Sequence, residues 1–472
     1  MPSETPMAGP AGRRGPLASP VRLGAATVIV IAVLVAGFGL FGGSGRSPSG
    51  VVAASTVALG SPSPAPTTSS AASVEASAPA ATVAEAATPE PTPKPTKTPK
   101  PTKTPKPTPS PSAPPVVAGG GTTTVAHHKA LQHRLDAWRA NHAVPGVSVA
   151  ILWDDGRSWL GTSGQANVAE HRSVTPDTGF ALASISKTFT AAVVLELIDE
   201  GKLKLDQRVA PLLPAFGIDR RVTVRMLLDH TSDLNDFFFN PRIDHALQSR
   251  PDAAWTAKRT WRYVPPGRIR PGKVWSYSNT NYLVLGELVK AITGHSLAKE
   301  VRARLLDPLH LQHAWYQSAE DPQADLSTGY RLVPVTGGAR AVPVAPASDI
   351  MPFRSVVTAA GGAGSIAATA EDTARWMQAF AGGKVLSPAM QGAMIGDAAY
   401  TRALHARITY GLGIQLVTID GHPALGHSGR YLGYRNVVRY LPAQGVTIAV
   451  LTNQGVVDPA VVAASLLKIA LR

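Results

Sequence analysis

Residues 44–121 restrict where this chain can build a folded core. The segment is rich in Ala, Ser, Thr and Pro, and from Thr88 to Pro115 it repeats Pro-Thr-Lys-Thr-Pro-Lys units. Such a composition buries too little apolar surface to offset the entropy of ordering, and it favours polyproline II. We therefore expect a disordered spacer here and a folded domain over residues 122–472. At about 3.1 Å per residue, the repeat could span on the order of 85 Å.

An apolar run precedes the spacer. Leu23 to Gly43 contains no charged residue, and three arginines lie upstream of it. About 20 such residues cross a bilayer as a helix, and upstream positive charge keeps the N-terminus in the cytoplasm. We expect residues 1–22 in the cytoplasm and a signal-anchor over residues 23–43. This predicts a single-pass protein of the cell membrane whose folded domain is extracellular.

A cleaved signal peptide is the alternative, because small residues such as Val52-Ala53-Ala54-Ser55 follow the apolar run. The protein would then be secreted. The spacer itself has two interpretations: its lysines either keep a passive linker soluble or contact an anionic cell-wall polymer.

Charge and cysteine content limit the classes of partner and site that we expect for this protein. Residues 1–121 hold nine Lys and Arg against four Glu, which leaves +9 of the net +14 on the rest of the chain. The positive residues of the folded part are scattered and form no recognition motif, so we expect no nucleic-acid partner. The absence of cysteine excludes disulfides, thiolate zinc sites and a lipidated-cysteine anchor.

Hydrophobic periodicity predicts an α/β (α+β) fold. Strands near both ends of the domain should form one antiparallel sheet flanked by helices, with a mainly helical lobe inserted between residues 180 and 394. A strand pair should turn at Asp154-Asp155-Gly156, and the last helix should begin with Asp458 as its N-cap. The expected elements are a helix over His127–His142, strands over Gly146–Trp153, Ser158–Val168, Tyr410–Ile419, Ala424–Ser428, Tyr434–Leu441 and Val446–Thr452, and a final helix over Pro459–Leu471.

Ser184 and Lys187 form the candidate catalytic pair. They lie where an extended apolar stretch from Phe180 meets a helical run. Residues three apart share one helix face, so an amine there can activate a serine hydroxyl. Ser-x-x-Lys also occurs at Ser296 and at Ser465, where the serines are expected to be an N-cap and a packed or solvated helix residue.

Three motifs together carry a family resemblance. Ser184-Ile185-Ser186-Lys187, Tyr277-Ser278-Asn279 and His427-Ser428-Gly429 resemble the motifs of the penicillin-recognising serine hydrolases. The separations of 93 residues from Ser184 to Tyr277 and 150 from Tyr277 to His427 match the branch of class C β-lactamases, D-alanyl-D-alanine carboxypeptidases and related esterases. The resemblance runs from about residue 126 to the end. Further similar stretches are Met226–Ser232, Tyr277–Gly286, Gly361–Ser365 and Thr369–Asp372.

The resemblance implies a role for each residue of the first two motifs. Ser184 would attack a carbonyl and form an acyl-enzyme. Lys187 would remove the serine proton, which requires that burial or a neighbouring cation lower the pKa of its amine. Tyr277 would accept that proton as a phenolate or pass it to the leaving group. Asn279 would orient Lys187 and a substrate amide.

The third motif is implied to bind substrate. His427 stands where many β-lactamases have lysine, and it would orient a substrate carboxylate or a proton relay at the end of a strand. Gly429 would let a substrate backbone approach. The N–H groups of Arg430 and Ser184 would form an oxyanion hole. The Arg430 side chain either binds a substrate carboxylate or points to solvent, and Asp233, where the family usually has glycine, affects a local turn.

Other features of the chain have simpler interpretations. The histidines of the first helix, His127, His128, His133 and His142, are interpreted as surface residues, and we expect neither metal nor cofactor. Phe237-Phe238-Phe239 either lines the cleft or fills the lobe core. The sequence thus predicts a membrane-tethered extracytoplasmic serine hydrolase, acting on peptidoglycan stem peptides ending in D-Ala-D-Ala or, second, on β-lactams. A promiscuous esterase or D-amino-acid peptidase and a non-catalytic wall-binding module are the alternatives.

Overall fold

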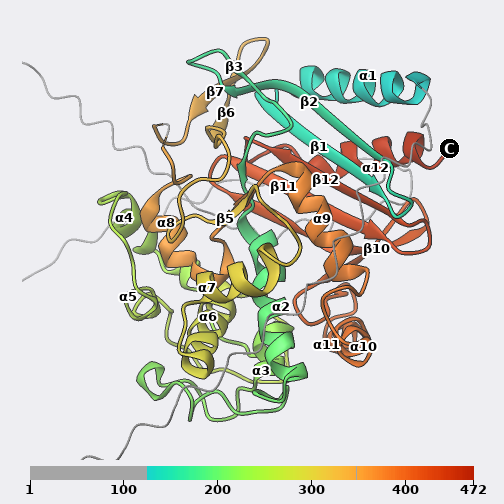
Figure 1. Cartoon of the computed structure of the whole chain (residues 1–472). Helices are drawn as coiled ribbons and strands as arrows, with labels where there is room; N and C mark the ends of the chain where they lie inside the picture. The colour runs from blue at the N-terminus through green and yellow to red at the C-terminus, as the bar shows by residue number, and fades with distance from the viewer. Residues whose placement is uncertain (1–124, 347) are drawn as a thin grey trace, which may run out of the picture. The chain divides into compact units, whose positions relative to one another are not determined.

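A seven-stranded antiparallel sheet joins the first and last strands of the domain (Figure 1). The computed structural model describes residues 125–346 and 348–472. The strand order is β3-β2-β1-β12-β11-β10-β9, and β1 (Gly146–Trp153) pairs with β12 (Val446–Thr452) so that Val149 lies opposite Val450. Every residue of β1 is buried, as expected for a central strand covered on both faces. The predicted sheet built from both ends is confirmed.

The remaining strands of this sheet are β2 (Ser158–Asn167), β3 (Arg172–Ser173), β9 (Gln415–Ile419), β10 (His422–Tyr431) and β11 (Tyr434–Leu441). Several boundaries differ from expectation by one or two residues, and two differ by more. β9 begins only at Gln415, because Gly413 turns the chain with φ +84° and a Cβ there would lie 2.2 Å from Ala191 Cβ. β10 continues to Tyr431, paired with Tyr434, so His427 lies within a strand and the prediction of a strand end was wrong.

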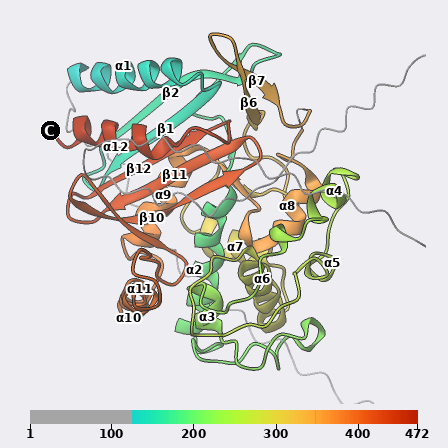
Figure 2. The ribbon, with the colours of Figure 1, turned by 180° about the vertical axis from the view of Figure 1, so that it is seen from behind.

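Helices α1 (Val125–Asn141) and α12 (Pro459–Ala470) cover one face of the sheet, as Figure 2 shows from behind. Leu131 and Leu466 are fully buried in the apolar cluster between these helices and the strands. Asp458 caps α12 as predicted, because its side chain accepts a hydrogen bond from the Ala460 N–H at 3.0 Å.

The opposite face of the sheet packs against α9 (Ala370–Ala381) and the helical part of the domain (Figure 1). Helix α2 (Ser186–Asp199) lies at the centre of this layer, and most of its side chains are buried. The other helices are α3 (Val224–Leu228), α4 (Ile243–Gln248), α5 (Ala257–Trp261), α6 (Asn279–Thr293), α7 (Leu297–Val301), α8 (Arg354–Ala360), α10 (Pro388–Gly396) and α11 (Ala398–Leu404), with a π-helical turn η4 (Arg302–Leu306) and 3-10 turns η1 (Ala183–Ile185), η2 (Pro214–Phe216), η3 (Phe237–Phe239) and η5 (Gly361–Ala363).

The lobe also contains short strands that the sequence did not predict. β4 (Phe180–Ala181), β8 (Ile366–Ala368) and β5 (Ala314–Tyr316) form a three-stranded sheet, and β6 (Tyr330–Val335) pairs with β7 (Gly338–Pro343) as a hairpin. β4 leads directly into η1 and α2. The small sheet therefore anchors the chain just before Ser184.

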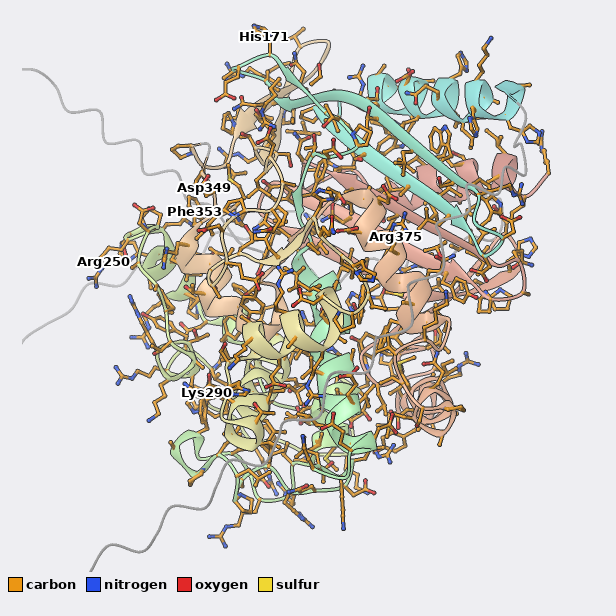
Figure 3. The ribbon with its side chains drawn as sticks, in the orientation of Figure 1. His171, Arg250, Lys290, Asp349, Phe353 and Arg375 are labelled. Atoms are coloured by element: carbon orange, nitrogen blue, oxygen red, sulfur yellow. The ribbon has the colours of Figure 1, made fainter. Side chains whose placement is uncertain are left out.

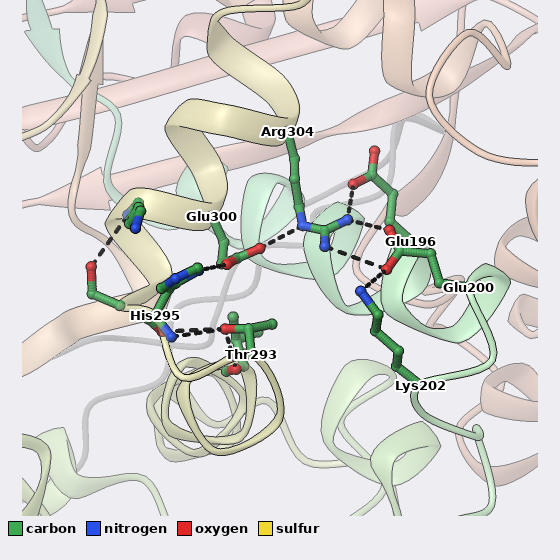
Figure 4. A network of polar contacts seen from close by, with 10 residues as sticks. Glu196, Glu200, Lys202, Thr293, His295, Glu300 and Arg304 are labelled. Atoms are coloured by element: carbon green, nitrogen blue, oxygen red, sulfur yellow. Dashed lines mark hydrogen bonds and ion pairs between the residues drawn. The ribbon is translucent and has the colours of Figure 1, made fainter. Parts of the chain in front are cut away.

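An ion-pair network ties α2 to the helices that follow α6 (Figure 4). Arg304 of η4 donates to Glu300 at 2.6 Å and to Glu196 of α2 at 3.3 Å, and it also pairs with Glu200. Lys202 pairs with Glu200 from the other side. The C-terminal end of α2 is thus held by charge as well as by packing.

The predicted signal-anchor over residues 23–43 and the spacer over residues 44–121 lie outside the described residues. Within residues 125–346 and 348–472, no helix is both long enough and apolar enough to cross a membrane.

Candidate active site

Ser184 and Lys187 meet as the sequence predicted. Ser184 lies in η1 and is half-buried, whereas Lys187, one turn later in α2, is 0% exposed. Lys187 Nζ lies 3.0 Å from Ser184 Oγ, 2.8 Å from Asn279 Oδ1 and 3.0 Å from Ala363 O. A neutral amine has two N–H groups and one lone pair. If Asn279 and Ala363 accept both N–H groups, the lone pair faces the serine hydroxyl.

Burial favours the neutral form of the Lys187 amine near physiological pH. It lowers the pKa of Lys187 to about 7, while the carboxylate of Asp236 acts in the opposite direction. Both effects are those expected of a lysine removed from water next to an acidic group. Lys187 therefore has the position and the proton affinity of a general base for Ser184.

The other two Ser-x-x-Lys pairs have structural roles. Ser296 is the N-cap of α7 and accepts a hydrogen bond from the Lys299 N–H at 3.3 Å. Ser465 donates to Val462 O within α12. Neither serine has a lysine amine beside its hydroxyl, which separates both from Ser184.

Tyr277 lies in the loop before α6, and the Ser184 side chain is among the groups that act on its pKa. Lys187 Nζ is 5.0 Å from the centre of its ring. Burial raises the pKa of Tyr277 well above 10, with Tyr410 as a further cause. The phenol is therefore protonated in the resting protein. Of the two predicted roles, donating a proton toward the leaving group fits this state, and accepting the serine proton as a resting phenolate does not.

Asp236 is a functional residue that the sequence analysis missed. It is 3% exposed, and its Oδ2 accepts hydrogen bonds from both the N–H and the side-chain Nδ2 of Asn279, at 2.9 and 2.7 Å. Because Nδ2 is held by Asp236, Oδ1 is turned toward Lys187. The only local signal was an aspartate before an aromatic run, where it also caps η3 through the Phe238 N–H.

His427 contacts a second residue that was missed, Tyr410. The Tyr410 hydroxyl lies 3.0 Å from His427 Nε2, and His427 Nδ1 lies 2.6 Å from Ser428 O. Since a carbonyl can only accept, Nδ1 carries the proton and Nε2 accepts from Tyr410. Burial, together with the charge of Lys187, lowers the pKa of His427 to about 3, so the ring is neutral. Its link toward Tyr277 runs through the Tyr410 ring, whose centre is 6.5 Å from that of Tyr277.

Gly429 brings β10 against the nucleophile segment. A Cβ at this position would lie 2.1 Å from Leu182 O, so only glycine permits the contact. The atom that requires glycine here is the protein's own Leu182 carbonyl oxygen, and the approach of a substrate backbone to Gly429 stays a prediction. Asn436, opposite Gly429 on β11, strengthens the junction by donating to Ala181 O at 2.9 Å.

Arg430 contributes to the site through its backbone. Pairing between β9 and β10 ends at Gly426 opposite Gln415, and Ser428 N–H then donates to the Gln415 side chain on that edge. Alternate residues of a strand direct their N–H groups to the same side, so the Arg430 N–H faces the open edge near η1. Its side chain is exposed and has Arg435 and Asp458 as its charged neighbours. The side chain thus lies in solvent in this structure, and its binding of a substrate carboxylate stays a prediction.

The chain was compared with known proteins. The family model described as Beta-lactamase matches residues 128–471. The chain belongs to this β-lactamase family. It is 32% identical to penicillin-binding protein 4 of Amycolatopsis lactamdurans over 345 residues, which cover 70% of this chain and 86% of that protein. It is 26% identical to a D-aminopeptidase of Brucella anthropi, covering 62% of this chain and 52% of that protein.

Solved structures of the β-lactamase fold agree with the architecture. A D-stereospecific amidohydrolase from Streptomyces sp. superposes with a TM-score of 0.59 and 25% identity, covering 69% of this chain and 94% of that one. A D-amino acid amidase from Ochrobactrum anthropi SV3 gives a TM-score of 0.63 at 22% identity, covering 73% and 98%. The protein is a serine hydrolase of this family, and its mixed helix and sheet fold is confirmed.

His230 is a third buried residue around the motifs of this β-lactamase family member. It is 0% exposed, its Nδ1 accepts from the Ser278 N–H at 3.1 Å, and its ring centre lies 4.2 Å from that of Tyr277. It therefore supports the loop that carries Tyr277.

Asp233 stands where the family usually has glycine. It adopts φ +59° and accepts a hydrogen bond from the Arg270 N–H, so the substitution affects only a local turn, as predicted.

The remaining candidates lie outside the site. Phe237 and Phe238 are buried in the lobe core, and Phe239 is 55% exposed. Among residues 125–346 and 348–472, no group of three or more histidine and carboxylate side chains is arranged to hold a metal ion. His127, His128, His133 and His142 lie along or just after α1, and all except the half-buried His127 are exposed.

Proposed function

We propose that the protein hydrolyses amide or ester bonds of D-configured substrates through an acyl-enzyme on Ser184. The observation that carries the proposal is the buried Lys187 amine, whose two other contacts are the acceptors Asn279 Oδ1 and Ala363 O. Neutral Lys187 takes the proton of Ser184 as Oγ attacks the carbonyl carbon. The N–H groups of Ser184 and Arg430 bind the oxyanion. The proton then passes to the leaving amine or alkoxide with help from Tyr277, and water hydrolyses the ester.

Peptides ending in D-Ala-D-Ala are the first substrate candidates, and β-lactams are the second. The names of the relatives, a penicillin-binding protein and a D-aminopeptidase, support a D-configured acyl group. Both substrate types place a strained or D-configured amide at the same serine, so one experiment can compare them.

An amidase, aminopeptidase or esterase is a specific second candidate. A carboxypeptidase must hold the free carboxylate of its substrate, and a cation beside His427 would serve this purpose. His427 is neutral, however, and the Arg430 side chain is exposed next to Arg435 and Asp458. Arg439, a buried cation near His427, already donates to Val438 O and Gln415 Oε1. These observations favour substrates without a C-terminal carboxylate, such as D-amino acid amides and short acyl esters.

Intact-protein mass spectrometry tests the proposal. The wild-type protein and Ser184→Ala are incubated with a penicillin, a D-Ala-D-Ala peptide, a D-amino acid amide and its L-enantiomer. We expect a covalent adduct on the wild type only, and turnover of the D-amide at a higher rate than the L-amide. Equal adduct formation on Ser184→Ala would refute the acyl-enzyme, and the ranking of the probes decides between the two candidates.

We also propose that the domain is tethered outside the cytoplasm by residues 23–43. Two features of the sequence support this proposal. An uncharged apolar run follows three arginines, and the segment after it is too poor in large apolar residues to form a folded core. Protease added to intact cells that express the full chain should remove the domain and leave a membrane-bound stub. Recovery of the domain in the medium would indicate a cleaved signal peptide, and protection inside the cells would contradict the proposal.

A further inference from the structure

Positive charge is concentrated in one part of the domain. Residues 242–273 contain eight Lys and Arg against two Asp, Asp244 and Asp252, a net of +6. Residues 125–472 as a whole carry a net of +9. This one stretch therefore supplies two thirds of the charge excess. Eight of the 36 Lys and Arg of residues 125–472 thus form a local concentration, although the others are spread along the chain as expected.

Most of these cations are exposed, and none has an acidic partner among the residues that the structure describes. Seven of the eight side chains are exposed, and the eighth, Arg259, stacks over the Trp255 ring at 4.0 Å. None of the eight forms an ion pair with a carboxylate in residues 125–346 and 348–472. Arginines elsewhere do: Arg304, for example, contacts three glutamates (Figure 4). We call the eight side chains the basic surface.

The segment that carries the basic surface is connected to the active site through α8. It follows α4 and α5 and the loop that leads to Tyr277, and α4 and α5 lie beside α8 in Figure 1. Ser355 connects α8 to α4 and to the loop that follows α4. Its hydroxyl donates to Leu247 O at 2.8 Å, and its N–H donates to Pro251 O. Helix α8 continues into Ala363, whose carbonyl accepts from Lys187. Figure 3 shows Arg250 directed outward at this side of the molecule, not far from Phe353.

We propose that the basic surface binds a phosphodiester polymer and thereby holds the domain beside its substrate. Six of the eight cations are arginines, whose planar guanidinium matches phosphate with two parallel hydrogen bonds. They are distributed over 32 residues and two short helices rather than gathered in a pocket, which suits a ligand with repeating charges. The proposed extracytoplasmic location supplies such a ligand in the form of anionic wall polymers.

Nucleic acid is the less fitting polyanion. Helices α4 and α5 have six and five residues, too short to serve as a recognition helix in a major groove. Single strands bind by stacking bases on exposed aromatic rings. The aromatic residues of the segment, Trp255, Trp261 and Tyr263, are buried or half-buried.

The test measures binding of the full chain, in detergent, to poly(glycerol phosphate) at increasing salt. In the test variant Arg250, Lys258, Arg262 and Arg268 are replaced by glutamine; all four are exposed. The matched control replaces Arg331, Arg340, Arg402 and Lys384, which are exposed and lie outside the segment. Both variants lose four charges. We expect the test variant to lose at least about tenfold in affinity at 0.1 M salt and about three to four units of the log–log salt slope.

Three outcomes would overturn the proposal. The first is that the wild type fails to bind the polymer at low salt, and the second is that the control variant loses as much affinity as the test variant. The third is that single-stranded RNA binds more tightly than the polymer, with the same dependence on the four side chains. The last result would assign the surface to nucleic acid. Ser184→Ala should bind like the wild type, so a failure of binding is distinguishable from a failure of the acyl-enzyme mechanism.

Discussion

Lys187 Nζ lies closer to Asn279 Oδ1, at 2.8 Å, than to Ser184 Oγ, at 3.0 Å. The short contact exists because Asp236 holds the other end of the Asn279 amide. An amide in this orientation presents an acceptor to the amine. It therefore restrains the lysine without competing for its lone pair, which remains directed at the serine.

The first prediction concerns the pH dependence of acylation. Lys187 must lose its proton to act as a base, and burial lowers its pKa to about 7. The rate of acylation by a fluorescent penicillin should rise between pH 5 and 9 with a midpoint near 7. His427, with a pKa of about 3, and Tyr277, with a pKa well above 10, do not titrate in this range. A rate that is constant from pH 6 to 8 would contradict the assignment of Lys187 as the base.

Asp236→Asn should change both the rate and its pH midpoint. Three N–H groups converge on the Asp236 carboxylate, two from Asn279 on Oδ2 and one from Phe238 on Oδ1. Asparagine has a single acceptor oxygen and turns an NH2 group toward one of these donors, so Asn279 loses its fixed orientation and kcat/KM should fall by about tenfold to a hundredfold. The Asp236 carboxylate raises the pKa of Lys187, so its removal should move the midpoint below 7. Asp372→Asn is the matched control: Asp372 is also buried and accepts from the His313 N–H, away from the site. The same midpoint in Asp236→Asn and wild type would exclude this electrostatic coupling.

Gly429→Ala should separate β10 from the nucleophile segment. The added Cβ would lie 2.1 Å from Leu182 O, and overpacking of this kind destabilises by about 1 to 3 kcal/mol. Acylation of Ser184 should be lost, because the Arg430 N–H moves with the strand. Gly392→Ala, in open space on α10, is the control and should stabilise by up to about 1 kcal/mol. Thermal unfolding and penicillin labelling measure the two effects, and a labelled Gly429→Ala protein would show that the strand contact is dispensable.

Glu196→Gln should alter the pH dependence of stability. Burial raises the pKa of Glu196 to about 7 from 4.5, so the folded state binds its proton more tightly than the unfolded chain does. The stability that this gives is fully present below pH 4.5 and is lost as the pH rises through 7. The side chain is partly in contact with water, so we expect the wild type to lose about 1 to 2 kcal/mol relative to Glu196→Gln between pH 5 and 8.

Glu200→Gln provides the contrast within the same network. Arg304 and Lys202 hold the pKa of Glu200 at about 2, so its carboxylate is charged throughout that range. Its replacement should change the free energy of unfolding by the same amount at pH 5 and pH 8. Parallel curves for wild type and Glu196→Gln in urea unfolding across this range would contradict the assignment.

The local parts of the site were predictable from the chain. Ser184 and Lys187 are three residues apart, and helix geometry alone places their side chains on one face. The caps at Asp458 and Ser296 also follow from short-range hydrogen bonds. The strand predicted to begin at Tyr410 begins only at Gln415, because the chain turns at Gly413 where it closely approaches Ala191 of α2.

Asp236, Tyr410 and His230 could not be predicted in their roles. Each acts on a residue at least 17 positions away: Asp236 on Asn279, Tyr410 on His427, and His230 on Ser278. No periodicity or motif spacing encodes such pairs, because they depend on how the lobe packs against the sheet. The order of the three motifs nevertheless indicated which segments would converge.

By itself the sequence determined the Ser184–Lys187 pair as the candidate nucleophile and base, and the family of the fold, since these depend on local spacing and on motif order. Only the tertiary structure decided that Lys187 can act as a base. Its lowered pKa comes from complete burial between α2, α6 and the Gly361–Ala363 turn, and its orientation comes from Asn279 and Asp236. Burial is a property of the packed molecule, because the same amine in an unfolded chain would keep its water and its ordinary pKa.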